Sequence, residues 1–349
     1  MRSPRFLLLV AFVTVAVQPG PASAGGADEE VPALEQVFAD AVKRVQPSLV
    51  SVSVVWKPGK EQLRTSRGFP LFRRGAGPFT GVVISSDGLI ITSDFNVSSD
   101  AESATVRLPN DPRVLQAEIL GRDVSRGIQL LKIPAKDLVV PEFARDESVK
   151  VGRWALACGV GEGTGAGGSA LPSLSVGIIS ATERIAGRAI QIDASTNPAN
   201  YGGPLIDIEG RVVGIITPLT HAGSREGISY YDSGIGFAVP VSDILKQLTK
   251  LKTGKVIRPA FLGIQFDTRY LAGGAKVVKV LPGTSAEKAG IRAGDLIVQF
   301  NNETMHTSFK LLHAIGRCRV DDVVKFKVVR EGKEMELTAT LGARPERVP

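Results

Sequence analysis

Hydrophobic residues in this chain occur mainly in short runs, separated by turns that contain glycine, proline, asparagine or aspartate. The length of these runs and their content of valine, isoleucine and threonine are typical of β-strands. The predicted strands of the first 250 residues cover 49–55, 81–84, 89–92, 105–108, 117–122, 128–133, 154–158, 175–180, 189–192, 205–208, 212–216 and 234–240. Residues 31–45 and 241–251 instead have the spacing of amphipathic helices. So many short strands predict a mainly β protein built from barrels or a sandwich.

The last third of the chain follows a different order of elements. Its predicted strands and helices are strand 261–264, strand 275–280, helix 286–289, strand 296–300, helix 308–318 and strands 323–330 and 334–341. Residues 250–258 are charged, poor in strand signals and end next to Pro259, so they are expected to be a linker. The sequence therefore predicts a first domain over 25–249 and a second over 259–345.

The first 24 residues have the three parts of a secretory signal peptide. Arg2 and Arg5 precede an apolar stretch over 6–17, and Ala22-Ser23-Ala24 fits a cleavage site after Ala24. No later run approaches the ~20 apolar residues that a membrane helix needs. We therefore expect an exported protein, periplasmic or extracellular after cleavage.

Charge and cysteine content narrow the function classes. The chain has 42 Lys and Arg against 35 Asp and Glu, a formal net charge of +7. Six of the basic residues lie in Lys57–Arg74, which is expected to be an exposed loop, either with an anionic partner or simply solvated. No nucleic-acid-binding pattern accompanies it.

Cys158 and Cys318 are expected to be two buried free thiols, in preference to a disulfide. No cofactor or metal site is expected.

The most informative stretch is Asp193-Ala194-Ser195-Thr196-Asn197-Pro198-Ala199-Asn200-Tyr201-Gly202-Gly203-Pro204-Leu205. Its adjacent glycines suit a tight turn that brings amide groups close together, as in the turn that holds the nucleophile and the oxyanion donors of trypsin-like proteases. It resembles the Asp-Ala-x-x-Asn-Pro-Gly-Asn-Ser-Gly-Gly-Pro-Leu signature of the HtrA/Deg family of exported serine proteases. This resemblance covers nearly all of the chain after residue 24. It implies a trypsin-like double β-barrel followed by a PDZ domain, a partly open barrel or β sandwich with two helices.

The resemblance fails at the catalytic positions. The nucleophilic serine of the family falls on Tyr201, and the glycine two residues earlier falls on Ala199, so Ala199, Asn200 and Tyr201 occupy the oxyanion turn. The family's Thr-Asn-x-His-Val matches residues 92–96 and places the histidine at Phe95. Its Asp-Ile-Ala-Leu-Leu-Lys matches residues 127–132 and places the aspartate at Gly127. This pattern predicts a pseudo-protease in which Phe95 and Tyr201 plug a vestigial cleft, an interpretation preferred over a new chemical role.

The remaining polar residues offer no evident substitute for the triad. The three histidines are His221, His306 and His313, none of which precedes the nucleophile position as the family's base does. The acidic and polar residues near the triad positions are expected to be solvated or to cap turns; they are Asp94, Asp123, Ser125 and Arg126. Proteolysis is therefore not expected.

The PDZ-like region predicts a binding groove. Backbone amides of Leu262, Gly263 and Ile264 would capture a terminal carboxylate, and the peptide would add as a strand beside residues 261–265. Apolar side chains predict a preference for apolar chain ends, although some of them belong to the core; they are Phe261, Leu262, Ile264, Leu312 and Ile315. The substitution Gly263→Trp is expected to block the groove and leave the fold intact.

Three hypotheses follow for the function. In the first, the chain binds peptides or unfolded protein ends in quality control, as a scaffold or as a regulator. In the second, it is an active serine endopeptidase of the HtrA/Deg type with an unrecognised triad. In the third, it is a structural partner of an active paralogue in a trimer, with a homotrimer as the other possible assembly.

Overall fold

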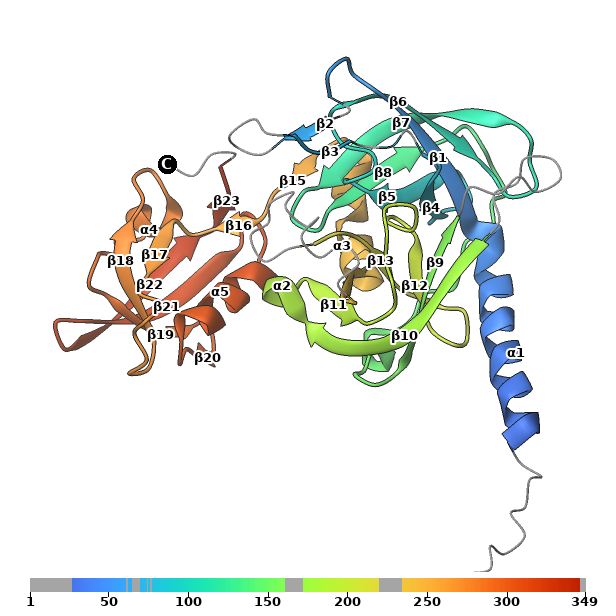
Figure 1. The fold of residues 1–349 in the computed structure, drawn as a ribbon. Coiled ribbons are helices and arrows are strands. Elements are labelled where there is room, and N and C mark those ends of the chain that lie inside the picture. The colour runs from blue at the N-terminus through green and yellow to red at the C-terminus, as the bar shows by residue number, and fades with distance from the viewer. Residues whose placement is uncertain are drawn as a thin grey trace, which may run out of the picture.

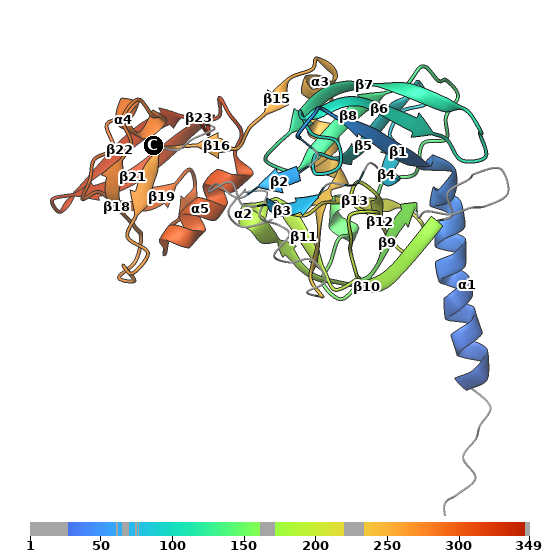
Figure 2. The same ribbon diagram turned by 45° about the horizontal axis from the view of Figure 1, so that its top comes forward.

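The computed structural model describes residues 27–60, 62–64, 70–73, 75, 77–160, 172–219 and 234–345. It consists of a double-barrel domain, an amino-terminal helix that extends away from it, and a smaller carboxyl-terminal domain at its side (Figure 1, Figure 2). The predicted signal segment 1–24 and His221 lie outside the described residues. Within the described ranges, no helix combines the length and apolarity required to cross a membrane.

The first barrel closes from six strands, with β7 pairing both β6 and β8. The strands are β1 (Leu49–Trp56), β4 (Phe79–Val83), β5 (Leu89–Ser93), β6 (Ala101–Arg107), β7 (Val114–Asp123) and β8 (Ile128–Lys132). Alternate residues of β1 (Val50, Val52 and Val54) lie in the barrel core, as the two-residue period of a strand requires. Val82 and Ile91 lie in a second core that also contains residues of the other barrel. Strands β4 and β5 are therefore buried along their whole length.

The second barrel is also closed and six-stranded, in the order β10-β11-β14-β13-β12-β9. Its strands are β9 (Trp154–Val160), β10 (Pro172–Glu183), β11 (Ala189–Ile192), β12 (Pro204–Ile206), β13 (Val212–Ile216) and β14 (Gly236–Pro240). Ile179, Ile190, Ile192 and Leu205 fill its interior. The predicted double β-barrel is confirmed, with strand ends shifted by a few residues.

Helices and short turns complete the first domain. Helix α1 (Ala27–Val45) begins earlier than predicted, so Pro32 lies within the helix and not at its start. Phe38 of α1 packs edge-to-face on Trp154, with ring centroids 5.4 Å apart. Helix α3 (Val241–Lys252) buries Val241, Ile244 and Leu251. Two single-turn 3₁₀ helices complete the connections: η1 (Gln46–Ser48) joins α1 to β1, and η2 (Asp146–Ser148) lies between β8 and β9.

The predicted linker over 250–258 is wrong in part. Its first residues continue α3 to Lys252, and strand β15 (Val256–Ile257) pairs in parallel with Arg122 and Asp123 of β7. The amides of Arg122 and Val124 donate to the carbonyls of Lys255 and Ile257, at 3.2 and 2.9 Å. A two-residue strand has no periodicity that a sequence can reveal, so only the pairing with β7 identifies it.

The basic segment Lys57–Arg74 also differs from the expected loop. It contains a small hairpin of β2 (Gln62–Arg64) and β3 (Pro70–Arg73), with Leu63 opposite Phe72. Lys57 and Lys60 are exposed. Arg67 and Arg74 lie outside the described residues. The proposed anionic partner of this segment therefore stays a prediction.

The carboxyl-terminal domain is a five-strand path, β17-β18-β19-β21-β22, with β20 added beside β19. Its elements are β16 (Ala260–Phe261), β17 (Ile264–Phe266), β18 (Ala275–Val280), α4 (Ser285–Lys288), β19 (Leu296–Phe300), β20 (Glu303–Thr304), α5 (Ser308–Arg317), β21 (Val323–Arg330), β22 (Lys333–Thr340) and β23 (Gly342–Ala343). The expected strand over 261–264 is divided, because Phe261 pairs with Gly342 whereas Ile264 pairs with Val280. Strand β17 consequently lies at an edge of the sheet.

The two domains meet where α5 packs against the turn α2 (Arg184–Gly187) of the second barrel. Ile185 and Ala186 have left-handed backbone angles, with φ of 53° and 56°. Nε2 of His313 lies 2.9 Å from the carbonyl oxygen of Glu183. A Cβ at Gly316 would lie 2.4 Å from the Cβ of Ala186, so this close approach requires glycine.

Candidate functional site

The turn at residues 197–203 is formed by its own hydrogen bonds and is seated on the first barrel. The hydroxyl of Thr80 in β4 donates to the carbonyl of Ala199 at 2.7 Å. Gly202 has φ of +88°, and a Cβ there would lie 2.4 Å from both the carbonyl oxygen of Thr80 and Oγ1 of Thr92. Only glycine fits this position, because the turn of one barrel touches the backbone of the other.

Phe95 and Tyr201 meet between the barrels. Their rings are arranged edge-to-face, with centroids 5.6 Å apart and an interplanar angle of 86°. Tyr201 is 5% exposed and belongs to the core of the second barrel, against which Phe95 packs. The side-chain amide of Asn96 donates to the carbonyls of Tyr201 and Pro198, at 2.8 and 3.1 Å. Tyr201 is thus part of the protein interior, and Phe95 is partly buried against it.

Gly127 lies beside this pair. Its carbonyl accepts from the amide of Asp94 at 2.8 Å, directly before Phe95 in the chain. Its φ is +66°, and a Cβ at this position would have Leu219 and Thr217 at 3.7 Å as its nearest neighbours. The structure therefore brings together the three positions that the sequence assigned to a triad.

The amides expected to stabilise an oxyanion already have partners within the turn. The amide of Ala199 donates to Oδ1 of Asn197 at 2.9 Å, and that of Tyr201 donates to the Asn197 carbonyl at 3.1 Å. Asn200 is buried, and its Oδ1 accepts from the amide of Asn197 at 2.8 Å. An oxyanion hole needs donors directed at the reacting oxygen, which these amides are not.

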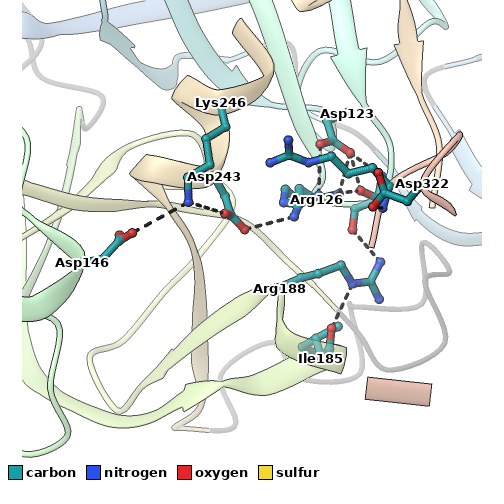
Figure 3. Close-up of polar contacts among 10 residues, drawn as sticks. Asp123, Arg126, Asp146, Ile185, Arg188, Asp243, Lys246 and Asp322 are labelled. Atoms are coloured by element: carbon teal, nitrogen blue, oxygen red, sulfur yellow. Dashed lines mark hydrogen bonds and ion pairs between the residues drawn. The ribbon is translucent and has the colours of Figure 1, made fainter. Parts of the chain in front are cut away.

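The polar residues next to Gly127 were expected to be solvated or to cap turns; the structure contradicts the first alternative and confirms the second for Asp123. Asp123, Ser125 and Arg126 are 2%, 6% and 7% exposed. Asp123 does cap the turn, since its Oδ1 accepts from the amides of Ser125 and Arg126 at 2.9 and 3.2 Å. Arg126 also bonds Asp243 on α3, at 3.0 Å (Figure 3). Packing of α3 and β15 against this turn causes the burial, which no local pattern reveals.

Neither thiol is placed as a nucleophile. Cys158 is fully buried, and burial raises the pKa of its thiol to about 12. Cys318 is half-buried, and burial with the nearby Asp322 raises the pKa of its thiol to about 11. Both cysteines are free, as expected, although Cys318 is less buried than predicted. Among the described residues, no group of three histidine, cysteine, aspartate or glutamate side chains has the arrangement of a metal site.

A pocket of about 780 Å³ lies between β17, α5 and the first domain. Its lining includes all six residues predicted for a peptide groove, namely Phe261, Leu262, Gly263, Ile264, Leu312 and Ile315. Leu312 is 53% exposed, whereas Leu262 and Ile315 are 2% and 6% exposed and belong to the domain core. The apolar surface offered to a ligand is therefore smaller than the sequence suggested.

Hydrogen bonds from later elements hold the loop before β17, where a carboxylate site is predicted. The carbonyls of Leu262 and Gly263 accept from the amides of Ala286 and Leu281, each at 2.8 Å. Within the described part of the chain, the amides of Leu262 and Gly263 donate to no other backbone group. Gly263 has φ of +89°, and a Cβ there would lie 2.2 Å from the Cβ of Thr284. The expectation that Gly263→Trp leaves the fold intact is therefore wrong.

Comparison with known domains and curated proteins finds two domain matches and relatives that are named as proteases. Residues 79–215 match the trypsin-like peptidase domain, and residues 260–341 match the PDZ domain. A probable periplasmic serine endoprotease DegP-like of Hahella chejuensis is 32% identical over 344 residues, which cover 88% of this chain and 70% of that relative. A protein with the same description from a Marinomonas species is 35% identical over 282 residues, covering 76% of this chain. The chain spans 57% of the length of that second relative.

Solved structures agree with these relatives. The serine endoprotease from Yersinia pestis is 29% identical with a TM-score of 0.64, covering 88% of this chain and 98% of its own. The HtrA-type protease AlgW with decapeptide is 26% identical with a TM-score of 0.65, covering 89% of this chain and 99% of its own. The two domains, their order and these relatives show that the chain belongs to the HtrA/Deg family of trypsin-like proteins with a PDZ domain.

Proposed function

We propose that this chain is an exported, catalytically inactive member of the HtrA/Deg family that binds the ends of peptides or unfolded proteins. Its role would lie in quality control, in scaffolding or in regulation, and binding would take place in the PDZ groove. The observation that carries this proposal is the cleft between the barrels. A phenylalanine, a glycine and a buried tyrosine meet where a triad would be.

Acyl transfer by a side-chain nucleophile needs a general base within hydrogen-bond reach. Phe95 and Gly127 carry no ionisable group. The described histidines belong to the PDZ domain, and His313 faces the carbonyl of Glu183. Without a triad, an intact oxyanion hole still accelerates hydrolysis by only about 10³–10⁴-fold over water. Here the amides that would form the hole donate to Asn197.

Binding is supported by the geometry of the groove. Strand β17 lies at a sheet edge, and a peptide adding to such an edge gains backbone hydrogen bonds independent of its sequence. The amides of Leu262 and Gly263 donate to no backbone group of the described chain, which supports their use by a terminal carboxylate. Related structures were solved for the HtrA-type protease AlgW with tripeptide and with decapeptide.

Hydrolysis is tested with casein and with a fluorophosphonate probe on the purified chain. We expect neither cleavage nor labelling. The four-residue variant Phe95→His, Gly127→Asp, Tyr201→Ser and Ala199→Gly restores the family pattern. Aspartate is tolerated at left-handed φ better than most residues, and there is room for its Cβ. We expect activity from the fourfold variant alone, because triad members act as a unit.

Binding is tested by fluorescence polarisation with labelled peptides that end in an apolar residue. Amidation of the peptide should weaken binding, because charge-assisted hydrogen bonds contribute about 1.5–3 kcal/mol each. The variant Leu312→Gln should weaken binding about fivefold through lost apolar contact. The matched control is Phe309→Gln, since Phe309 is 66% exposed on the same helix and does not line the pocket. Equal affinity for free and amidated peptides would contradict a site that recognises chain ends.

The second candidate function is an active serine endopeptidase with an unrecognised triad. It is favoured by the peptidase-domain match and by the names of the curated relatives. Casein cleavage by the purified chain, with loss of cleavage on fluorophosphonate labelling, would establish it.

Because those relatives are named periplasmic, we place the chain in the same compartment. Co-expression with an active paralogue, followed by size measurement, tests a mixed trimer against a homotrimer.

A further inference from the structure

The carboxylate-loop end of the groove opens into a space lined by both domains. The chain runs from β15 directly into the loop at Phe261–Gly263, so residues 255–259 lie at this end of the groove. Basic residues dominate the lining here, whereas Asp321 is its one acidic residue among the described ones. Five of these basic residues are Lys250, Lys255, Arg258, Arg319 and Arg344. This charge suits an anionic occupant.

Two buried arginines of the first domain complete the lining. Arg126 is compensated by two carboxylates, with its guanidinium 3.0 Å from Asp243 and 3.5 Å from Asp123 (Figure 3). Its Nε has no hydrogen-bond partner among the described residues. The carboxylates next to Arg126 are thus already engaged within the protein.

Arg188 differs, because its partners are neutral. It is 9% exposed, and its Nε and Nη1 donate to the carbonyls of Ile185 and Ser125, each at 2.9 Å. Figure 3 shows its guanidinium beside Ile185 and away from Asp243. No carboxylate of the described chain lies within ion-pair distance of it. Burial, and then repulsion by Arg126 and Arg344, lower the pKa of Arg188 to about 10, opposed by Asp123, so it stays charged near neutral pH.

A buried charge without a directly paired carboxylate is costly, and a carboxylate that reaches it gains a strong hydrogen-bonded pair. The contact of Gly316 with Ala186 holds the turn that precedes Arg188 against α5, the helix that forms one wall of the groove. Arg188, Leu262 and Gly263 line the same pocket, so a chain end bound in the groove ends in the pocket that this arginine lines. The terminal carboxylate is accounted for by the loop amides, so the arginine is left for a second carboxylate.

We propose that the groove selects chain ends that carry an aspartate or glutamate within the last few residues, and that Arg188 of the barrel domain pairs with that side chain. This inference rests on the proposed function of the groove as a peptide site. It assigns the preference for an acidic residue to the first domain, while the PDZ domain binds the backbone and the terminal carboxylate.

The test uses the chain from residue 25 onward and labelled decapeptides with the same apolar last residue. One peptide is neutral, four carry a single glutamate at one of the four positions before the last, and a control carries it at the amino end. We expect at least one of the four to bind about tenfold more tightly than both the neutral peptide and the control, equivalent to about 1.4 kcal/mol. This advantage should shrink at high salt.

The variant Arg188→Gln should reduce the advantage to less than about twofold and leave the affinity of the neutral peptide within about twofold. Arg184→Gln is the matched control, because Arg184 lies in the same turn but is exposed and outside the pocket lining. If circular dichroism shows that Arg188→Gln is unfolded, Arg188→Met, which keeps a long unbranched side chain without the charge, replaces it, and the same loss of advantage is expected.

Two results overturn the inference while leaving the groove a peptide site. One is equal affinity for all the peptides, and the other is a glutamate advantage that survives in the folded Arg188 variant. If no peptide binds, the neutral one included, the proposed function itself fails and this inference fails with it.

Discussion

Replacing Tyr201 with serine separates a packing residue from a hidden nucleophile site. In the structure the ring of Tyr201 is 5% exposed and contacts Phe95 edge-to-face. Removal of a buried aromatic ring costs about 3–5 kcal/mol, of which the ring pair accounts for about 0.5–1.5 kcal/mol. Because whole domains are stable by only about 5–15 kcal/mol, this loss is large. We therefore expect Tyr201→Ser to destabilise the double barrel strongly and to gain no hydrolytic activity.

Tryptophan fluorescence during guanidinium unfolding measures this loss in the correct domain. The two tryptophans of the chain, Trp56 and Trp154, lie in the first and second barrel. Their signal therefore reports unfolding of the barrels and not of the PDZ domain. The control Tyr201→Phe keeps the ring and should change stability far less than Tyr201→Ser.

Two results would contradict the expected behaviour of Tyr201→Ser. A Tyr201→Ser protein as stable as the parent would show that the ring is not packed as described. Cleavage of casein by this single variant would show that a base and an oxyanion hole already exist around residue 201. Either result would refute the reasoning that the family's catalytic cleft has become protein interior.

Other predictions concern the PDZ domain. Burial alone would raise the pKa of Asp295, but hydrogen bonds from Arg330 and from the amide of Arg292 outweigh it and lower that pKa. Ionised Asp295 therefore stabilises the folded state above its unfolded pKa of about 4, and this stability is lost as the pH falls through the lower folded pKa. Calorimetry from pH 5 to 2 should show a smaller loss of stability on acidification in Asp295→Asn than in the parent protein. At neutral pH, Asp295→Ala should lower the free energy of unfolding, since it removes the carboxylate partner of Arg330 and the acceptor of the Arg292 amide. Gly263→Ala should lower the melting temperature more than Gly283→Ala. Both glycines have left-handed φ, which costs alanine about 1–2 kcal/mol at either position. Only a Cβ at residue 263 also overlaps Thr284.

Much of the architecture could be read from the chain alone. Short alternating runs such as 49–55 and 212–216 are strands because one face of each meets a core, and this period of two is a local property. The turn at 197–203 was recognisable because the left-handed φ that it requires, as at Gly202, favours glycine. The triad positions followed from the motifs around them, and the structure indeed places Phe95, Gly127 and Tyr201 side by side.

The tertiary structure decided where charge is buried. Asp123 and Arg126 look like loop residues in the sequence, yet α3 and the paired strand β15 cover them. Strand β15 itself is two residues long and exists only through its hydrogen bonds to β7. No window of sequence contains these partners, which lie more than a hundred residues apart.

In the groove, too, some features follow from the local sequence and others from contacts between distant segments. The sequence predicts a carboxylate loop within Phe261–Ile264, because the pattern that indicates it is contiguous. That Arg188 of the barrel lines the same pocket depends on the close contact between Gly316 and Ala186, which joins the two domains. Sequence determines what each segment can form, whereas desolvation and the pairing of charges are set by which segments pack together in space.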